Sequence, residues 1–412
     1  MPRLFEPYRS WRVAAMLALG FASGLPSPLT GATLSAWLRS AGVSLTSIGA
    51  LALVSLPYNL KFLWAPVLDR FDLPWLGRRR GWMVVLQLAL LLAIAALGSA
   101  DPRRAPLVLA LLALVTASLS ASFDVVADAY RTEALAPAQH AAGTAVFVTG
   151  YRLALIVAGA GALILSDHLS WSVVYGALAA LTAVGMVCAV LAPPTLAEAQ
   201  RPASLRDAIV RPLVELLGRP HAGATLAVVM LYKVGDVIAG YLLTPFLIDV
   251  GLTRSEIGAI QKGLGLVASI GGSLLAGGLV PRLGLRLALI AFGLLQAGAN
   301  LLYIAVGGLS HGRLLVVTAV GIDNLCGGLG TAAFVTFMMS LCDRRFTAFQ
   351  YALLSSLSTV AGRLLGAAGG WLAERWGWPA FFAITIAAAL PALMVLWRVP
   401  ALAAGPEPRL GA

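Results

Sequence analysis

Long apolar runs constrain this chain more than any other feature, and the stretch "PLVLALLALVTASLSASF" (Pro106 to Phe123) is typical of them. Runs of about 20 residues span the ~30 Å hydrocarbon core of a bilayer as α-helices, at ~1.5 Å of rise per residue. They lack the period-two alternation of a membrane β-barrel. The chain is 59% hydrophobic and 11% charged, whereas soluble chains are roughly 45 to 50% apolar. We therefore predict an all-α integral membrane protein.

Twelve apolar segments are long enough to be membrane spans. We place them near residues 13–36, 48–69, 82–99, 105–127, 141–165, 172–191, 221–247, 257–280, 285–306, 313–340, 348–371 and 378–397. Lys and Arg concentrate in the N-terminal tail, in alternate loops and in the C-terminal tail. By the positive-inside rule, this asymmetry predicts a multi-pass membrane protein with both termini in the cytoplasm.

The two halves of the chain resemble each other. The segment "WLRSAGVSLTSIGAL" (Trp37 to Leu51) aligns with "FLIDVGLTRSEIGAI" (Phe246 to Ile260) without gaps. We predict an N-terminal six-helix bundle (1–192), a cytoplasmic linker (193–220) that could form an amphipathic surface helix, and a C-terminal six-helix bundle (221–412). Two repeats of six helices in the same orientation indicate a major facilitator fold, with a substrate cavity between the repeats.

Nine charged side chains fall inside predicted spans, where each costs about 2.5 to 3.5 kcal/mol if it faces lipid. They therefore line a polar interior or pair with one another, as Lys233 and Asp236 could at i, i+3 spacing. The five cations exceed the four anions, which suits an anionic solute. The nine residues are Lys61, Lys233, Lys262, Arg152, Arg363, Asp124, Asp128, Asp236 and Asp323.

Asp124 and Asp128 lie one helical turn apart at the end of the fourth predicted span. Burial penalises a carboxylate charge, and a second carboxylate penalises it further, so we expect the two side chains to titrate as a coupled pair. This makes them candidates for proton coupling. In the alternative, Asp128 simply pairs with a basic residue such as Arg131 or Lys61.

Several function classes are disfavoured. The sequence contains no HExxH, GxSxG or Walker A motif, so a secondary carrier without a cofactor is favoured over an enzyme or an ATP-driven pump. The net charge of +11 comes from arginines scattered through short loops, which does not indicate nucleic-acid binding. The three cysteines form no CxxC pair, and we predict no metal site.

The loop "DRFDLPWLGRRRGW" (Asp69 to Trp82) carries four arginines and two aspartates between the second and third spans. It resembles the loop signature of major facilitator proteins, in which ion pairs latch the cytoplasmic gate. A plain topology signal is the alternative, and the two roles are compatible. The predicted gate residues are Asp69, Arg70, Arg78, Arg79 and Arg80.

Seven motifs, in order, resemble the AmpG-type muropeptide permease family of cell-wall recycling. They are "GFASGLPSPLTGATLSAWL", "PYNLKFLWAPVLDR", "GRRRGW", "DVVADAYRTEAL", "GYRLAL", "LYKVGD" and "DNLCGGLGTAAFV", and they extend over nearly the whole chain. The resemblance implies proton-driven import of N-acetylglucosaminyl-1,6-anhydro-N-acetylmuramic acid, with or without its stem peptide, from periplasm to cytoplasm across a bacterial inner membrane. The expected partners are this anionic solute, protons and membrane lipid, and we expect a monomer.

The resemblance also suggests roles for single residues. Asp124 and Asp128 match the family's fourth-span aspartates. Other embedded charges become candidate substrate contacts, as do two tyrosines that could stack on sugar faces, although each tyrosine alone is more readily an ordinary packing or interfacial residue. The candidates are Lys61, Arg152, Tyr151, Lys233, Asp236, Tyr232, Asp323, Asn324 and Arg363.

Two departures from the family pattern stand out. Phe123 replaces a glutamine of many members, and some members continue into two further C-terminal helices where we expect this chain to stop after twelve. The first departure bears on substrate preference. Other anionic solutes, such as siderophores or acyl-coenzyme A, are the second hypothesis, and an enzyme acting on lipid-linked sugars is the third.

Overall fold

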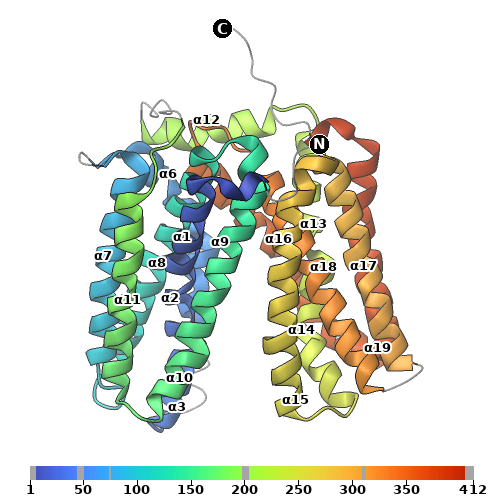
Figure 1. Cartoon of the computed structure of the whole chain (residues 1–412), viewed down its shortest axis with the longest axis horizontal. Coiled ribbons are helices and arrows are strands. Elements are labelled where there is room, and N and C mark those ends of the chain that lie inside the picture. The colour runs from blue at the N-terminus through green and yellow to red at the C-terminus, as the bar shows by residue number, and fades with distance from the viewer. Residues whose placement is uncertain (1–5, 44–50, 74–75, 197–203, 309–311, 404–412) are drawn as a thin grey trace, which may run out of the picture.

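Two bundles of helices stand side by side in the computed structural model of the chain (Figure 1). The structure describes residues 6–43, 51–73, 76–196, 204–308 and 312–403. Helices between residues 11 and 191 make one bundle, and those between 222 and 398 make the other. No strand occurs in this part of the chain, so the prediction of an all-α protein is confirmed.

The first bundle contains three long unbroken helices: α7 (Arg78–Ser99), α8 (Pro106–Ala134) and α11 (Trp171–Leu191). It begins with a short 3-10 helix, η1 (Glu6–Arg9). The first and fifth spans each run through consecutive shorter pieces. These are α1 (Trp11–Gly24), α2 (Pro26–Leu29) and α3 (Ala32–Ser40), and then η4 (Pro137–Gln139), α9 (His140–Leu155), the π-helix η5 (Ile156–Gly161) and α10 (Ala162–Ser166).

The second predicted span, 48–69, is not one continuous helix in the structure. Its described part consists of η2 (Leu51–Ser55), α5 (Leu56–Leu60), η3 (Lys61–Leu63) and α6 (Ala65–Arg70), while residues 48–50 lie outside the described ranges. Pro57 and Pro66 each stand near the start of one of the two α-helical pieces, where a missing N–H costs least. This broken span places Lys61 at a joint between pieces.

The linker helix α12 (Leu205–Leu217) lies across one end of the molecule, the end at which the N-terminus also lies (Figure 1). Ser204 caps it by accepting a 3.1 Å hydrogen bond from the backbone N–H of Asp207. The second bundle follows. It comprises α13 (Ala222–Leu231), α14 (Val234–Asp249), α15 (Arg254–Gly258), the π-helix η6 (Ala259–Gly265), α16 (Leu266–Leu283), α17 (Leu285–Gly308), α18 (Arg313–Ser340), α19 (Thr347–Arg398) and the 3-10 helix η7 (Pro400–Ala403).

The helix α19 is too long for one span and contains two. Gly377 interrupts it with φ 77° and ψ 169°, a conformation that strongly favours glycine, and Pro379 follows within the next turn. The break falls between the predicted spans 348–371 and 378–397. Ten helices of the described chain are long and apolar enough to cross a membrane, and the second and eleventh predicted spans are the two outside this set.

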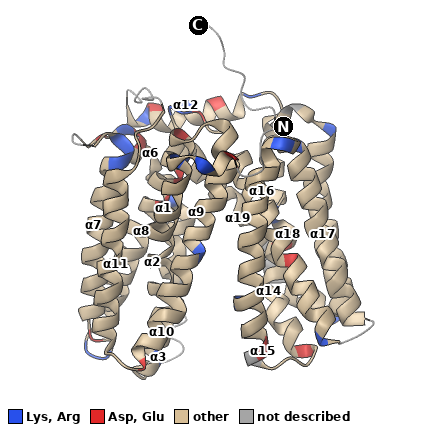
Figure 2. Cartoon of the chain, viewed as in Figure 1, with Lys and Arg blue, Asp and Glu red and all other residues tan. Residues whose placement is uncertain are grey.

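The two bundles meet toward the α12 end. There the hydroxyl of Thr144 on α9 donates a 3.4 Å hydrogen bond to the sulfur of Met339 on α18. The hydroxyl of Tyr8 on η1 reaches the carbonyl oxygen of Leu274 on α16 at 2.5 Å. Figure 2 shows that charged residues gather at the ends of the bundles and are sparse along their lengths. The few charges within the spans are therefore candidates for function.

Candidate functional site

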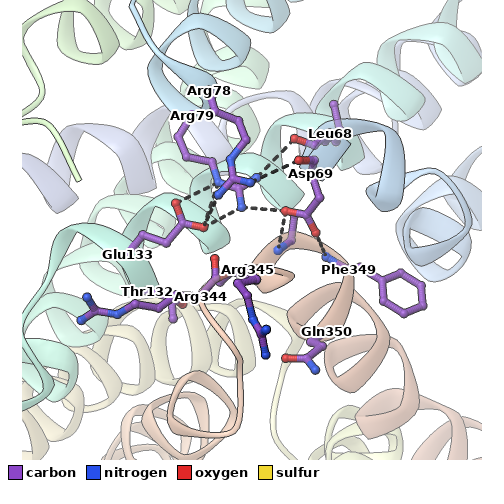
Figure 3. A network of polar contacts seen from close by, with 12 residues as sticks. Leu68, Asp69, Arg78, Arg79, Thr132, Glu133, Arg344, Arg345, Phe349 and Gln350 are labelled. Carbon is purple, nitrogen blue, oxygen red and sulfur yellow. Dashed lines mark hydrogen bonds and ion pairs between the residues drawn. The ribbon is translucent and has the colours of Figure 1, made fainter. Parts of the chain in front are cut away.

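A buried ion network ties α6, α7 and α8 together at the α12 end (Figure 3). The Nη2 atom of Arg79 lies 2.7 Å from Oδ1 of Asp69 and 2.6 Å from Oε1 of Glu133. Its Nε also donates to both oxygens of Glu133, each at 3.1 Å. These side chains are at most 3% exposed. Burial makes an uncompensated charge costly, so the network depends on all three partners.

Asp69 extends this network to the other bundle. Its Oδ2 accepts a 2.9 Å hydrogen bond from the backbone N–H of Phe349, and its Oδ1 accepts one of 3.3 Å from Ala348. Both N–H groups belong to the first turn of α19, where they have no intrahelical acceptor and where the helix dipole favours an anion. One carboxylate thus joins the two halves.

The five predicted gate residues separate into two groups. Asp69 and Arg79 form the network, and Arg78 joins it with Nη2 at 3.4 Å from Glu133. Arg80 instead donates to the carbonyl oxygens of Ala189 and Val190 at the end of α11. The guanidinium of Arg70 lies 5.7 Å from the ring centroid of Phe71. The gate role itself stays a prediction.

Glu133 is the member of this network that the sequence did not single out. It stands within the motif "DVVADAYRTEAL", but it follows Asp128 by five residues rather than by a full turn. Only the fold reveals that Glu133 shares Arg79 with Asp69.

The linker helix is also tied to the start of α19. The Nε2 of Gln350 donates to Oε2 of Glu215 at 2.7 Å, and its Oε1 accepts from the backbone N–H of Asp343 at 2.6 Å. Arg219 pairs with Glu215 at 2.6 Å. The linker is thus bonded to the helix whose first turn Asp69 binds.

Asp128 lies in a second cluster, deeper along α8. Its Oδ1 is 2.9 Å from Nη2 of Arg131, and its Oδ2 is 3.7 Å from Nζ of Lys61. Arg131 also donates to the hydroxyl of Tyr351 on α19 at 2.9 Å, and its guanidinium lies 4.5 Å from the ring centroid of Phe147. These contacts agree with the alternative in which Asp128 pairs with a basic residue such as Arg131 or Lys61.

Asp124 has different surroundings. It accepts a hydrogen bond from the hydroxyl of Ser23 on α1, and no ion pair to it occurs within the described part of the chain. Tyr58 and Tyr151 are close enough to interact with its charge. Asp124 is half-buried, and the hydroxyl of Ser23 is its one donor in the described part of the chain, while Lys61 and Arg131 act on its charge without forming an ion pair. Its role in proton coupling stays a prediction.

Arg152 is half-buried on α9, and its Nη1 is buried with no hydrogen-bond partner in the described protein. An unpaired guanidinium of this kind can receive a carboxylate of a solute. Arg363 lies on α19, but its side chain falls outside the described residues. The predicted substrate contacts of both arginines stay predictions.

In the second bundle, Lys233 and Asp236 form an ion pair where the seventh span is interrupted between α13 and α14. This is the pairing that the i, i+3 spacing suggested. The neighbouring Tyr232 is buried, donates to the carbonyl oxygen of Leu289 at 2.9 Å and stacks on Phe334 with ring centroids 5.1 Å apart. Its ring therefore packs inside the bundle in this conformation.

Asp323 and Asn324 follow each other on α18. Asp323 accepts from Nε2 of Gln296 at 2.8 Å and from the hydroxyl of Tyr303 at 3.1 Å, both on α17. Asn324 donates to the carbonyl oxygen of Val320 at 2.9 Å. Lys262 on η6 is exposed.

A large cavity lies elsewhere in the first bundle. It has a volume of about 630 Å³, is lined almost entirely by apolar side chains of α3, η2, α5 and α8, and includes none of the predicted site residues.

Comparison with known proteins identifies the class. The Major Facilitator Superfamily model matches residues 13–367. The structure resembles the E. coli fucose:proton symporter FucP with a TM-score of 0.71 at 14% identity, covering 94% of this chain and 98% of that one. It resembles the human organic anion transporter TETRAN with a TM-score of 0.69 at 15% identity, covering 93% and 99%. The chain therefore has the fold of a multi-pass major facilitator transporter.

Sequence relatives narrow the assignment. The chain is 43% identical over 396 residues to the "Anhydromuropeptide permease" of Escherichia coli K12, covering 96% of this chain and 80% of the relative. It is 30% identical over 404 residues to "Putative transporter AmpG 4" of Rickettsia felis, covering 96% and 97%. The chain belongs to the AmpG-type muropeptide permease family. It is a transporter, and the hypothesis of an enzyme is not supported.

Proposed function

We propose that this transporter imports anhydromuropeptides, the disaccharide with or without its peptide, by proton symport for peptidoglycan recycling. The observation that carries the substrate assignment is the 43% identity, over 96% of the chain, to a protein named for that solute. The Nη1 atom of Arg152, which is buried with no hydrogen-bond partner in the described protein, suits the carboxylates of such solutes.

The direction of transport follows from the proposed orientation. We infer that the α12 end, with both termini, faces the cytoplasm, as the distribution of Lys and Arg favours. Because hydrogen bonds join the halves toward that end, this conformation is then closed to the cytoplasm.

Single cysteines replacing Arg206 on α12 and Asp167 at the opposite end test the orientation. Impermeant reagent added outside intact cells should label only the Asp167 site, and labelling of the Arg206 site would overturn it.

The organisation of the chain is part of the same proposal. We infer two six-helix halves, 1–192 and 221–412, joined by the linker 193–220, working as a monomer in the lipid bilayer. Each half would then contribute charged residues to proton coupling and substrate binding. They are Lys61, Asp124, Asp128 and Arg152 in the first half, and Lys233, Asp236 and Asp323 in the second.

The substrate is tested by competition in proteoliposomes. Uptake of labelled anhydromuropeptide under an imposed pH gradient should be inhibited by unlabelled anhydromuropeptide and not by a siderophore or acyl-coenzyme A. Stronger inhibition by either of these competitors would assign the protein to another anionic solute.

A further inference from the structure

Asp323 differs from the paired carboxylates of the spans in the kind of partners that it has. Asp128 has Lys61 and Arg131 beside it, and Asp236 has Lys233. Asp323, which is half-buried, has only neutral donors: the amide of Gln296 on Oδ1 and the hydroxyl of Tyr303 on Oδ2. No ion pair to Asp323 occurs within the described part of the chain.

These two donors can accommodate both protonation states of Asp323. A tyrosine hydroxyl donates to a carboxylate and accepts from a carboxylic acid, so Tyr303 can reverse its role when Oδ2 gains a proton. Gln296 continues to donate to Oδ1 in either state. An Arg or Lys partner could not make this change, because it only donates and favours the charged carboxylate.

A small cavity adjoins this group on the side of Lys233 and Asp236. Its volume is about 10 Å³, and Gln296, Asn300 and Thr385 also line it. The Oε1 of Gln296 and the Oδ1 of Asn300 are buried and accept no hydrogen bond from the described protein. A space of about this size with several polar partners suits one water molecule. It provides a polar connection between Gln296, which binds Asp323, and the Lys233–Asp236 pair.

The charges that face Asp323 largely cancel. Asp236 and Lys233 act on it from the start of α14 and are paired with each other, while Tyr303 and Gln296 act from α17 and Cys326 from its own helix. On η6, Lys262 is exposed, and the side chain of Arg363 on α19 lies outside the described residues. Protonation of Asp323 therefore leaves no described counter-ion unpaired.

We propose that Asp323 is a proton-binding carboxylate of the second bundle. It takes up a proton on Oδ2 from one aqueous side and releases it to the other, with Tyr303 changing from donor to acceptor. This inference rests on the proposed proton symport and adds a second proton site to Asp124. It replaces the predicted role of Asp323 as a substrate contact.

The direct test is an infrared pH titration of the purified protein in lipid, which follows the carbonyl stretch of protonated carboxylic acids. The Asp323→Asn variant should lose one component of the titrating band, and Asp124→Asn should lose another. Asp101→Asn, which removes an exposed carboxylate in the loop between α7 and α8, is the matched control and should lose neither. A titrating band that is unchanged in Asp323→Asn would overturn the proposal.

A second variant keeps the carboxylate in place. Tyr303→Phe removes only the hydroxyl on Oδ2, so it should shift the frequency and the midpoint of the component assigned to Asp323 and leave the Asp124 component unchanged. No shift in a folded Tyr303→Phe protein would contradict the role given to that hydroxyl.

Transport separates proton coupling from substrate binding. Asp323→Asn should lose accumulation driven by a pH gradient but retain exchange of labelled for unlabelled anhydromuropeptide, because exchange requires no net proton movement. Retained accumulation would overturn the proposal, and so would loss of both activities. If the wild type itself transports no muropeptide while the Asp323 infrared component persists, the proposed function fails and the proton site stands.

Discussion

The carboxylate of Asp69, at the end of the second span, accepts a 2.9 Å hydrogen bond from the backbone N–H of Phe349, 280 residues further along the chain. The same carboxylate pairs with Arg79 at 2.7 Å. An ion network within one half of the protein therefore also holds the first turn of a helix in the other half. Opening the α12 end must break this connection.

Replacing Asp69 with Asn should weaken closure of the α12 end. The variant leaves Arg79 with one carboxylate, and breaking a buried pair costs about 3 to 5 kcal/mol. A cysteine replacing Ala352, which is 1% exposed and lies on α19 one helical turn beyond Ala348, should react faster with a thiol reagent in the Asp69→Asn background. The control is Arg211→Gln on α12, at the same end but outside the network, which should leave the rate unchanged. Equal labelling rates in the wild type, the Asp69→Asn variant and the control variant would show that Asp69 does not contribute to closure of this end.

Glu133 should act together with Asp69, because both carboxylates bind the guanidinium of Arg79. In a double-mutant cycle, Glu133→Gln and Asp69→Asn should be non-additive in unfolding free energy by about 0.5 to 3 kcal/mol. The pair Glu133→Gln and Asp101→Asn provides the comparison. Asp101 lies in the loop before α8, where it pairs with Arg104 and not with Arg79 or Glu133. Additive effects on the unfolding free energy in both cycles would mean that Glu133 and Asp69 are not energetically coupled through Arg79.

Gly277 on α16 tests the second contact between the halves. A Cβ at this position would overlap the hydroxyl oxygen of Tyr8 and lie 2.9 Å from Cα of Ala142 on α9. Gly277→Ala should therefore destabilise the closed end by about 1 to 3 kcal/mol, seen as faster labelling at the Ala352 site. Gly271→Ala on the same helix is the matched control, because nothing lies within 4 Å of its added Cβ. Identical behaviour of the two variants would refute the steric account.

The sequence predicted much of this architecture for a simple reason. A bilayer selects helices by length and hydrophobicity, and both properties can be read along a single segment. The break at Gly377 falls between two predicted spans, as the composition suggested. The fragmentation of the second span was not predicted, because hydropathy does not register how Pro57 and Pro66 divide a helix.

Hydrogen-bond partners that lie on different helices could not be predicted from the sequence. The pairing of Lys233 with Asp236 follows from spacing within one segment, and the structure contains it. The partners of Asp323 are Gln296 and Tyr303 on a different helix, so finding them requires the rotation of each helix about its axis. The same holds for Tyr351, which receives a hydrogen bond from Arg131 on the opposite half.

Neutralising Arg152 should affect anionic solutes most. Its Nη1 is unpaired in the described protein, and charge-assisted hydrogen bonds are the stronger kind. Arg152→Gln should therefore weaken binding of peptide-bearing fragments more than binding of the bare disaccharide, measured by calorimetry on purified protein. Arg104→Gln, which changes an exposed arginine, is the control. Equal loss for both ligands would instead indicate a structural role.

Proton-driven accumulation through Asp124 is the central claim, and one measurement tests it most directly. Proteoliposomes containing wild type or Asp124→Asn receive labelled anhydromuropeptide under an imposed pH gradient, acidic on the periplasmic side. The wild type should concentrate the solute above equilibrium and lose this ability with a protonophore. Asp124→Asn, nearly isosteric but unable to carry the proton, should only equilibrate the solute, with binding less sensitive to pH. Accumulation by Asp124→Asn equal to wild type, with the same pH profile, would contradict the account.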